Sequence, residues 1–394
     1  MTMNRRQLLT AAAALGAAGI APHSVTAAPA GKSVAAARSD FPWAGSETYL
    51  NCATEHPLGL HSANAMREYI GCLTSGPDSG RAKYENAELQ ERVRERFARL
   101  IGATPPEIAF VPSTQIAENL ILDGLRINES GGNVVTNDLH YGGSLFNYQA
   151  RKERGLDARI LKHKDYTIDI RDWEKAIDRR TKLVSLALVS NVNGYLDDIR
   201  AIADLAHSHG ALVFVDVIQA AGAVPIDVRP MGIDLLACSA YKWLMGGRFG
   251  YLYVARELHE NALQPVQFGS KGSGAKDARQ YQVSTPNHLG FVCQHEALAY
   301  ILELGVENIR EHVRPLTERL RKELPAAGYA CLTPAGTESP IVTFLVPDAA
   351  RARTRLSEAG VIVTLRDGSP GEMRVSPSVF NNVADIDRLI GALA

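Results

Sequence analysis

The fold class of this chain is decided by a short segment that reads Val213-Phe214-Val215-Asp216-Val217-Ile218-Gln219. Runs that are apolar at successive positions are typical of strands buried on both faces in a parallel sheet. The first apolar run ends in a carboxylate, Asp216. In open α/β sheets ligands bind beyond the carboxyl ends of the strands, so Asp216 stands where a binding site is expected. Taken alone, the pattern also fits an aspartate that caps the next helix.

Apolar runs of the same kind recur on both sides of this segment. We predict strands at 108–111, 133–136, 183–189, 211–215, 234–237 and 249–254. The stretches between them have helical spacing, as at 198–209. Strands that alternate with helices predict an α/β fold with a large, doubly wound and mostly parallel sheet.

The pattern changes after about residue 290. A helical stretch at 291–324 precedes a final group of apolar runs and helices, with runs at 341–346, 361–365 and 373–376. The chain has 394 residues, more than the ~250–300 at which a single hydrophobic core stops growing. We therefore predict a large domain over 31–287 and a small C-terminal α/β domain over 288–394.

Composition and charge argue against several classes of protein. Lys and Arg number 42 against 43 for Asp and Glu, so no global positive field would attract nucleic acid or an anionic membrane. The five cysteines are scattered without paired spacing, which fits neither a disulfide framework nor a zinc site. We therefore expect a globular protein that takes a small molecule and binds no metal ion.

The first thirty residues form a segment of their own. Arg5-Arg6 and a short Ala-rich run precede a small-residue stretch at 25–30 that resembles a cleavage site. The run is too short and too poor in Leu and Ile for a stable membrane span. Because the arginine pair resembles a twin-arginine signal, we expect residues 1–30 to engage the twin-arginine export machinery and the mature protein to be periplasmic or secreted. The alternative is a basic, Ala-rich, disordered N-terminus.

A second segment places a lysine among apolar residues, and it reads Cys238-Ser239-Ala240-Tyr241-Lys242-Trp243-Leu244-Met245-Gly246-Gly247. A buried lysine has a lowered pKa and becomes a nucleophile, which a Schiff base with a carbonyl cofactor requires. The alternative is a lysine whose stem lies along apolar surface while its ammonium group reaches water.

Asp216, Gln219 and Lys242 stand in an order and spacing that resemble the class V aminotransferase family. This family includes cysteine desulfurases, isopenicillin-N epimerase and kynureninase. The resemblance implies pyridoxal 5'-phosphate (PLP) as cofactor and the fold type I of PLP-dependent transferases. It implies that Lys242 forms the Schiff base, that Asp216 pairs with the pyridinium nitrogen and that Gln219 meets the ring oxygen. A carboxylate beside that nitrogen keeps it protonated, so the ring accepts electrons from a carbanion at Cα.

Further pieces of the chain resemble the family's cofactor site. The segment that follows the first strand and opens a helix, as the family's phosphate loop does, reads Ser113-Thr114-Gln115. Helix N-terminal amides favour anions, which suits a phosphate, and the alternative is a plain capped helix. Ser239 matches the family's serine that binds the phosphate shortly before the Schiff-base lysine. Tyr241, directly before Lys242, belongs to the same motif as Asp216, Gln219 and Lys242. Either His140 or Tyr141 stands where the family supplies the ring that stacks on the cofactor.

Three more residues bring the substrate and a second subunit into the prediction. Asn191, in a Ser-Asn-x-x-Gly segment, matches an asparagine that bonds cofactor or substrate. Arg374 matches the arginine whose forked guanidinium would bind the substrate α-carboxylate, the alternative being a surface arginine on an edge strand. Thr285 resembles a residue that reaches the phosphate across a dimer interface. The resemblance therefore implies a homodimer.

The reaction is less determined than the cofactor. Cysteine desulfurases carry a nucleophilic cysteine shortly before the arginine, and residues 363–371 contain none. The leading hypothesis is an enzyme acting at Cα of an amino acid, an epimerase or a C–S lyase, in which Lys242 removes the Cα proton and Asp216 sustains the electron sink. A transaminase of the same family and a PLP-fold protein that binds without turnover are the alternatives.

Overall fold

The computed structural model describes residues 33–76, 79–260, 262–268, 274–283 and 285–394. The predicted export signal at residues 1–30 lies outside the described residues. Lys32–Ala394 forms one compact unit. Among the helices of the described ranges, none is long and apolar enough to cross a membrane.

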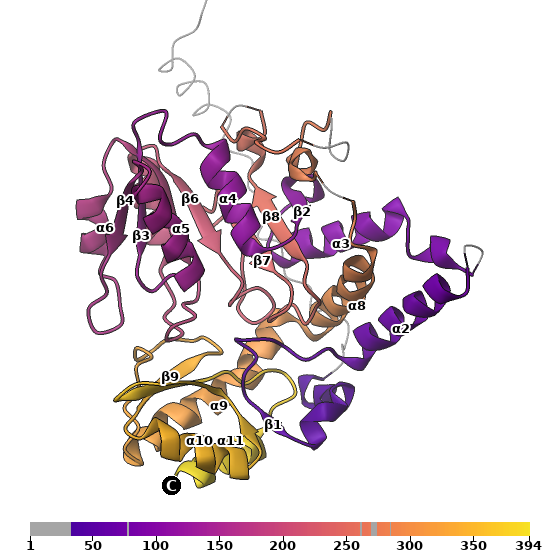
Figure 1. The fold of residues 1–394 in the computed structure, drawn as a ribbon, viewed down its shortest axis with the longest axis vertical. Helices are drawn as coiled ribbons and strands as arrows, with labels where there is room; N and C mark the ends of the chain where they lie inside the picture. The colour runs from indigo at the N-terminus through magenta and orange to yellow at the C-terminus, as the bar shows by residue number, and fades with distance from the viewer. Residues whose placement is uncertain (1–32, 77–78, 261, 269–273, 284) are drawn as a thin grey trace, which may run out of the picture. The chain divides into compact units, whose positions relative to one another are not determined.

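The centre of this unit is a seven-stranded sheet (Figure 1). Its strands are β2 (Ile108–Val111), β3 (Asn133–Asn137), β4 (Asp157–Leu161), β5 (Thr181–Ala187), β6 (Leu212–Asp216), β7 (Leu235–Ser239) and β8 (Gly250–Val254). They are arranged in the order β2-β8-β7-β6-β5-β3-β4. Strands β4, β3, β5, β6 and β7 run parallel, whereas β8 is antiparallel to both of its neighbours. The predicted mostly parallel sheet is confirmed. β4 was not predicted, because this edge strand carries two charged residues, Asp157 and Arg159.

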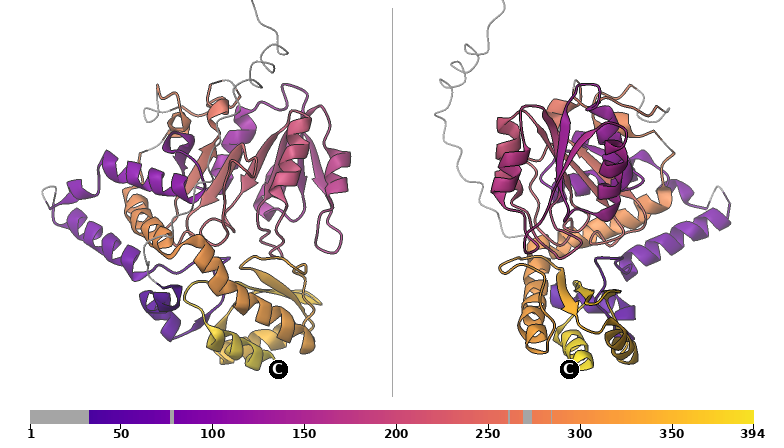
Figure 2. Two further views of the ribbon diagram at one scale, coloured as in Figure 1. Left: turned by 180° about the vertical axis from the view of Figure 1, so that it is seen from behind. Right: turned by 60° about the vertical axis from the view of Figure 1, so that its left-hand side comes forward.

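Helices lie on both sides of the large sheet, as the right-hand view of Figure 2 shows. They are α2 (Leu60–Thr74), α3 (Ala87–Leu100), α4 (Thr114–Gly124), α5 (Gly142–Lys152), α6 (Ile170–Ala176), α7 (Ile199–Ser208) and α8 (His288–Leu304). Helix α4 packs beside α5, and α6 packs beside α7. Helices α2, α3 and α8 form a third group, in which α3 also contacts β2. This arrangement is the doubly wound α/β fold that the alternation of elements predicts.

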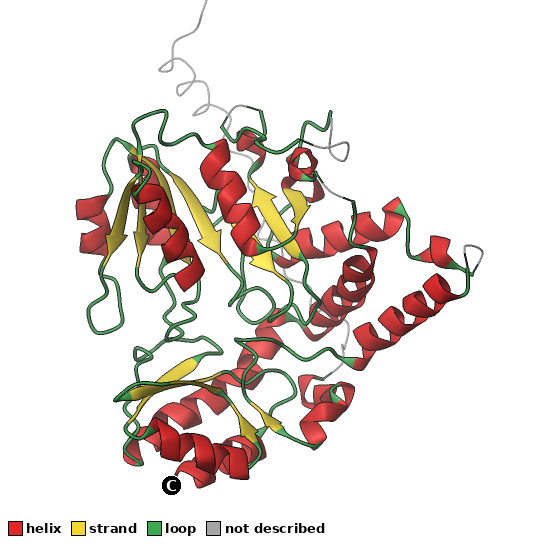
Figure 3. Ribbon diagram, viewed as in Figure 1, coloured by secondary structure: helices red, strands yellow, loops and turns green. Residues whose placement is uncertain are grey.

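The C-terminal part has a second sheet, the smaller group of yellow strands in Figure 3. It is antiparallel, in the order β11-β12-β9, with bounds β9 (Val342–Val346), β11 (Thr364–Arg366) and β12 (Gly371–Val375). Three helices accompany it, α9 (Val306–Ala326), α10 (Ala349–Glu358) and α11 (Val383–Leu393). Leu320, Phe344, Met373 and Ile386 form a core here that is separate from the core of the large sheet.

A segment near the start of the described residues completes this second core. Strand β1 (Thr48–Tyr49) pairs in parallel with β10 (Val361–Ile362), and the fully buried Leu50 joins Phe344 and Met373. This pairing was not predicted, because a strand of two residues shows no readable periodicity. It brings residues 48–56 to the same side of the molecule as Arg374.

The predicted helix at 291–324 is two helices. Helix α8 ends at Leu304 and α9 begins at Val306, and Gly305 between them has a φ of 78°, a conformation that side-chain-bearing residues rarely adopt. Short 3-10 helices lie at Val34–Asp40, Pro42–Gly45, Arg81–Lys83, Pro105–Glu107, Arg256–Leu258 and Ala278–Tyr281.

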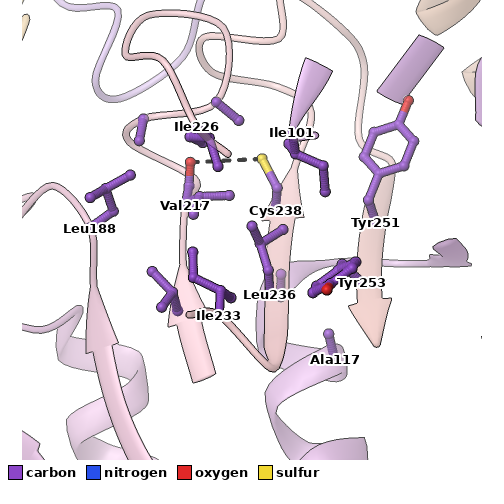
Figure 4. Packing of buried hydrophobic residues seen from close by; sticks show 14 of the residues in the cluster. Ile101, Ala117, Leu188, Val217, Ile226, Ile233, Leu236, Cys238, Tyr251 and Tyr253 are labelled. Carbon is purple, nitrogen blue, oxygen red and sulfur yellow. Dashed lines mark hydrogen bonds between the residues drawn. The ribbon is translucent and has the colours of Figure 1, made fainter. Parts of the chain in front are cut away.

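The core of the large sheet extends to the carboxyl ends of its strands. In Figure 4, Leu236 and Cys238 of β7 lie beside Val217, which follows β6, and the Cys238 thiol lies 3.9 Å from the Val217 carbonyl oxygen. Leu188, which follows β5, belongs to the same cluster. The segments that follow these strands are thus held in place by buried apolar contacts.

Candidate active site

One edge of the large sheet collects most of the predicted site residues. Asp216 ends β6, Ser239 ends β7, Asn191 follows β5 and His140 follows β3. Because these strands are parallel neighbours, their carboxyl ends meet at the same edge, where open α/β sheets bind ligands.

Lys242 lies in a closed turn directly after β7. Its carbonyl accepts from the backbone N–H of Met245 over 2.8 Å, and Met245 has a positive φ of 53°. The turn packs so tightly that a Cβ on Gly246 would lie 1.8 Å from the Gln294 amide nitrogen. A non-glycine residue at position 246 would therefore displace the Gln294 side chain, which accepts from Tyr251 and donates to the carbonyl of Leu244.

The ammonium group of Lys242 is buried beside two charged groups. The residue is 7% exposed, and burial lowers the pKa of Lys242 to about 8. The negative charge of Asp216 opposes this shift, and the positive charge of Arg374 adds to it. Lys242, Asp216 and Arg374 are thus electrostatic neighbours, and near neutral pH an appreciable fraction of Lys242 is the free amine that a nucleophile or base requires.

Asp216 is 3% exposed and faces the same site. Burial raises the pKa of Asp216 to about 6, while the backbone N–H of Ile218, which donates to Oδ1 over 2.9 Å, and the charge of Lys242 lower it. The residues that follow Asp216 form a turn and no helix. The alternative that Asp216 caps a helix is therefore wrong, and its second carboxylate oxygen is not committed to a backbone cap.

Gln219 is clamped by two neighbours. Its Oε1 accepts from the indole Nε1 of Trp243 over 2.9 Å, and its Nε2 donates to the carbonyl of Ala53 over 3.0 Å. This clamp fixes the side chain between the lysine turn and the segment that follows β1. The second hydrogen of Nε2 remains free to donate to a ligand, and the predicted contact with the ring oxygen of the cofactor needs such a donor.

The start of α4 meets the end of β7. The backbone N–H of Thr114 donates to Ser239 Oγ over 2.8 Å, and the two hydroxyl oxygens are 3.0 Å apart. Ser113 caps α4, because its Oγ accepts from the N–H of Ile116. Gln115 is exposed and donates to the carbonyl of Gly143 over 3.1 Å. Thr114 and Ser239 therefore form a pair of hydroxyl groups at a helix N-terminus, a suitable place for an anion.

The two candidate stacking rings differ in burial. His140 is 1% exposed, and burial lowers the pKa of His140 to about 3, so the ring is neutral. Tyr141 is 44% exposed. The ring of Tyr241 lies near two basic side chains, with its centroid 5.6 Å from Lys242 Nζ and 5.5 Å from the guanidinium carbon of Arg248.

Arg374, on β12, reaches the site from the smaller sheet and is 6% exposed. Its guanidinium donates to the carbonyl of Asn191 over 2.8 Å, to Thr54 Oγ1 over 2.8 Å and to Thr364 Oγ1 over 3.2 Å. Burial lowers the pKa of Arg374 to about 10. The alternative of a surface arginine is therefore wrong. Thr54 and Thr364 were not predicted, because hydroxyl residues in irregular or short segments carry no sequence signal of their own.

Two buried polar atoms at this place have no hydrogen-bond partner among the described residues, Nε of Arg374 and Oδ1 of Asn191. An unpaired buried polar atom is costly, so each atom marks a place where a ligand group fits. The unpaired donor suits a carboxylate, and the unpaired acceptor suits an N–H or O–H group.

Thr285 is a predicted site residue that no described hydrogen bond joins to the others. It is exposed, in the segment just before α8, and within one chain it is not brought to the Thr114–Ser239 pair by any described hydrogen bond. A cavity of about 200 Å³ between α9 and residues 336–340 contains none of the predicted site residues. We place the active site by its buried charges and unpaired polar atoms.

The chain is similar to known proteins over most of its length. Residues 62–389 match the family model described as aminotransferase class-V. An uncharacterized aminotransferase YcbU of Bacillus subtilis is 28% identical over 91% of this chain and 96% of its own length. A probable cysteine desulfurase of Methanothermobacter thermautotrophicus is 30% identical over 72% of this chain and 74% of its own.

Solved structures show the same fold. The apo structure of a cysteine desulfurase from Thermococcus onnurineus has a TM-score of 0.79 and 22% identity, and covers 90% of this chain and 96% of its own. The cystine C–S lyase C-DES, in complex with cysteine persulfide, has a TM-score of 0.80 and 20% identity, with coverages of 90% and 98%. The predicted fold type I is confirmed. The chain belongs to the class V aminotransferase family, and it is an enzyme with pyridoxal phosphate as its cofactor.

Proposed function

We propose that this enzyme acts at the Cα atom of an amino acid and that Lys242, Asp216 and Arg374 carry the reaction. The observation behind the proposal is that a buried lysine of lowered pKa and a buried carboxylate lie at one edge of the large sheet, and a buried arginine with an unpaired nitrogen reaches them from the smaller sheet. When bound, PLP supplies an electron sink for the charge that develops at Cα. The residues present fit this cofactor, since the Thr114–Ser239 hydroxyl pair suits its phosphate and Asp216 suits its ring nitrogen.

Each of the three residues has a separate role in this proposal. Arg374 binds the substrate α-carboxylate through donors that include its unpaired Nε, because guanidinium groups bind carboxylates with two parallel hydrogen bonds. Lys242 removes the proton from Cα as its free amine and returns a proton later. Asp216 would stabilise a positive charge on the ring nitrogen of PLP. Its carboxylate is buried, and the backbone N–H of Ile218 is the one backbone donor that it accepts from. Gln219, Asn191 and Tyr241 line the same place.

Between the possible reactions, we favour β-elimination or epimerisation over persulfide transfer. Persulfide transfer needs an accessible thiol of low pKa at the substrate. All five cysteines lie within the described ranges, and burial raises the pKa of four of them, Cys52, Cys238, Cys293 and Cys331. Cys72 lies on α2, which contributes none of the predicted site residues. The likeness to desulfurases therefore supports the cofactor chemistry at Cα and a C–S lyase branch without a cysteine nucleophile.

A screen of amino acids with the PLP-loaded protein tests this proposal. L-cysteine, L-cystine and S-conjugates should yield ammonia and a keto acid if the enzyme is a C–S lyase. Loss of optical activity without ammonia would identify an epimerase, and dependence on an added keto acid would identify a transaminase. Lys242→Ala, the control, should be inactive with every compound. A wild-type protein that binds PLP but changes none of these compounds would support the alternative of a binding protein without turnover.

A further inference from the structure

A chain of buried polar side chains runs from Glu118 to His140 beneath the site. Glu118 lies on α4, Tyr148 on α5 and Ser185 on β5, and His140 follows β3. Each of the four residues is 1% exposed or less. The hydroxyl oxygen of Tyr148 lies 2.8 Å from Glu118 Oε1 and 2.7 Å from Ser185 Oγ. Ser185 Oγ in turn lies 3.4 Å from His140 Nε2.

The hydrogen positions along this chain follow from its two ends. The backbone N–H of Tyr141 donates to His140 Nδ1 over 2.7 Å, so the single hydrogen of the neutral ring is on Nε2 and faces Ser185. At the other end, Glu118 Oε1 accepts the one hydroxyl hydrogen of Tyr148, both when Glu118 is ionised and when it carries a proton on its other oxygen, Oε2. Ser185 then donates to Tyr148 and accepts from His140. All the hydrogen bonds point in one direction, from His140 to Glu118.

We propose that Glu118 is a positioning residue of the cofactor site, which acts through Tyr148 and Ser185 to hold the neutral His140 ring in one orientation. This proposal rests on the proposed function, because it gives His140 the role of the ring that stacks on the cofactor. Tyr141, the other candidate, has an exposed side chain and no such support. A neutral ring beside a positively charged cofactor ring avoids repulsion between like charges.

The surroundings of Glu118 explain why a carboxyl group is held in the core. Burial raises the pKa of Glu118 to about 7, and the hydroxyl groups of Tyr148 and Ser144 oppose this shift. The charge of Asp216 raises the pKa of Glu118 further, and Arg151 on α5 is the cation that opposes it. Oε2 of Glu118 has no hydrogen-bond partner among the described residues. A buried carboxyl group costs stability, and the link to His140 gives it a function.

Nuclear magnetic resonance of the full chain, with 15N-labelled histidine, tests the hydrogen-bond chain directly. The His140 signal is identified by its loss in His140→Gln. In the wild type without PLP, we expect His140 as the neutral form with an observable, hydrogen-bonded Nε2 proton. Tyr148→Phe and Glu118→Leu should each shift or lose that proton signal. Glu118→Gln should retain it, since an amide oxygen still accepts from Tyr148.

Tyr251→Phe is the matched control. Tyr251 is also fully buried, and its hydroxyl donates to Gln294 Oε1 over 2.7 Å, outside this chain. It should leave the His140 signal unchanged. Unchanged His140 signals in Tyr148→Phe and Glu118→Leu would overturn the proposal.

PLP binding supplies the second readout. Losing one hydrogen bond that orders the ring should weaken PLP binding roughly threefold to tenfold in Glu118→Leu and leave Glu118→Gln close to the wild type. Equal PLP affinity of the wild type and Glu118→Leu would overturn the positioning role alone. Failure of the wild type to bind PLP would overturn the proposed function as well, which separates the two outcomes.

Discussion

At the scale of single residues, burial gives Asp216 and Lys242 properties that free side chains lack. It raises the pKa of Asp216 to about 6 and lowers the pKa of Lys242 to about 8, and each charge partly offsets the shift of the other. A positive ring nitrogen beside Asp216 would favour its carboxylate, and the neutral form of Lys242 is the one that can accept a proton. The pair is therefore prepared for an electron sink and a base.

Asp216→Ala tests the first half of this argument. We expect PLP to bind still, because the phosphate contacts remain, while kcat falls roughly a hundredfold to a thousandfold through loss of the fixed charge. Steady-state kinetics on a substrate found by the screen, together with the absorption spectrum of the bound cofactor, would measure both effects.

Asp234→Asn is the control for this prediction. Asp234 precedes β7 at the opposite end of the strand, where it accepts from the N–H of Val213 over 2.8 Å. It should leave kcat unchanged. Near-normal turnover of Asp216→Ala would mean that Asp216 only closes its turn.

The residues of the site were predictable from the sequence to different degrees. Asp216, Lys242 and Arg374 stand in recognisable segments, and the structure brings them together. Glu118 and Thr54 gave no such signal, because their positions in the site depend on helix–strand packing and on the pairing of β1 with β10. Gln219 was named for the cofactor alone, whereas the structure shows that it also donates to the carbonyl of Ala53. Ser113 caps α4, as the alternative of a plain capped helix expects.

At the scale of elements, the junction of β7 with α4 is the feature that suits a phosphate. Ser239 ends the strand, and Thr114 is the first residue of the helix, so an anion there would meet two hydroxyl groups and the helix N-terminus. Thr285 is too exposed to belong to this junction within one chain. We propose that it reaches the phosphate of the second subunit in a homodimer.

Loss of the Ser239 hydroxyl or of the Thr285 hydroxyl should weaken PLP binding. A hydrogen bond to a charged acceptor contributes ~1.5–3 kcal/mol, so we expect Ser239→Ala and Thr285→Val each to raise the Kd for PLP about tenfold or more. Ser208→Ala, at the exposed end of α7, should have no effect. Fluorescence titration of PLP into the three variants measures this.

Analytical ultracentrifugation at different dilutions then distinguishes the role of Thr285 from that of Ser239. If Thr285 acts across an interface, dilution to the monomer should release cofactor from the wild type. A monomer that keeps full PLP occupancy would contradict the shared site, and an unaltered Kd in Ser239→Ala would contradict the phosphate junction itself.

At the scale of the whole molecule, the alternation of strands and helices was sufficient to predict the large sheet, because buried parallel strands are apolar at successive positions. It was insufficient for the pairing of β1 with β10, since these strands have two residues each and the pairing joins segments more than three hundred residues apart. Gly305 divides a helical pattern that reads as continuous. The site depends on both sheets, as Arg374 lies on a strand of the smaller sheet and Lys242 follows a strand of the larger one.

Chemical labelling of the lysine tests the central claim most directly. The PLP-loaded wild-type protein is reduced with borohydride, digested and mapped by mass spectrometry, with Lys242→Ala treated in parallel. We predict that the reduced cofactor is attached to the peptide that contains Lys242 and that the variant carries no label. Attachment of the label to any other lysine, or an equally labelled Lys242→Ala, would contradict the account.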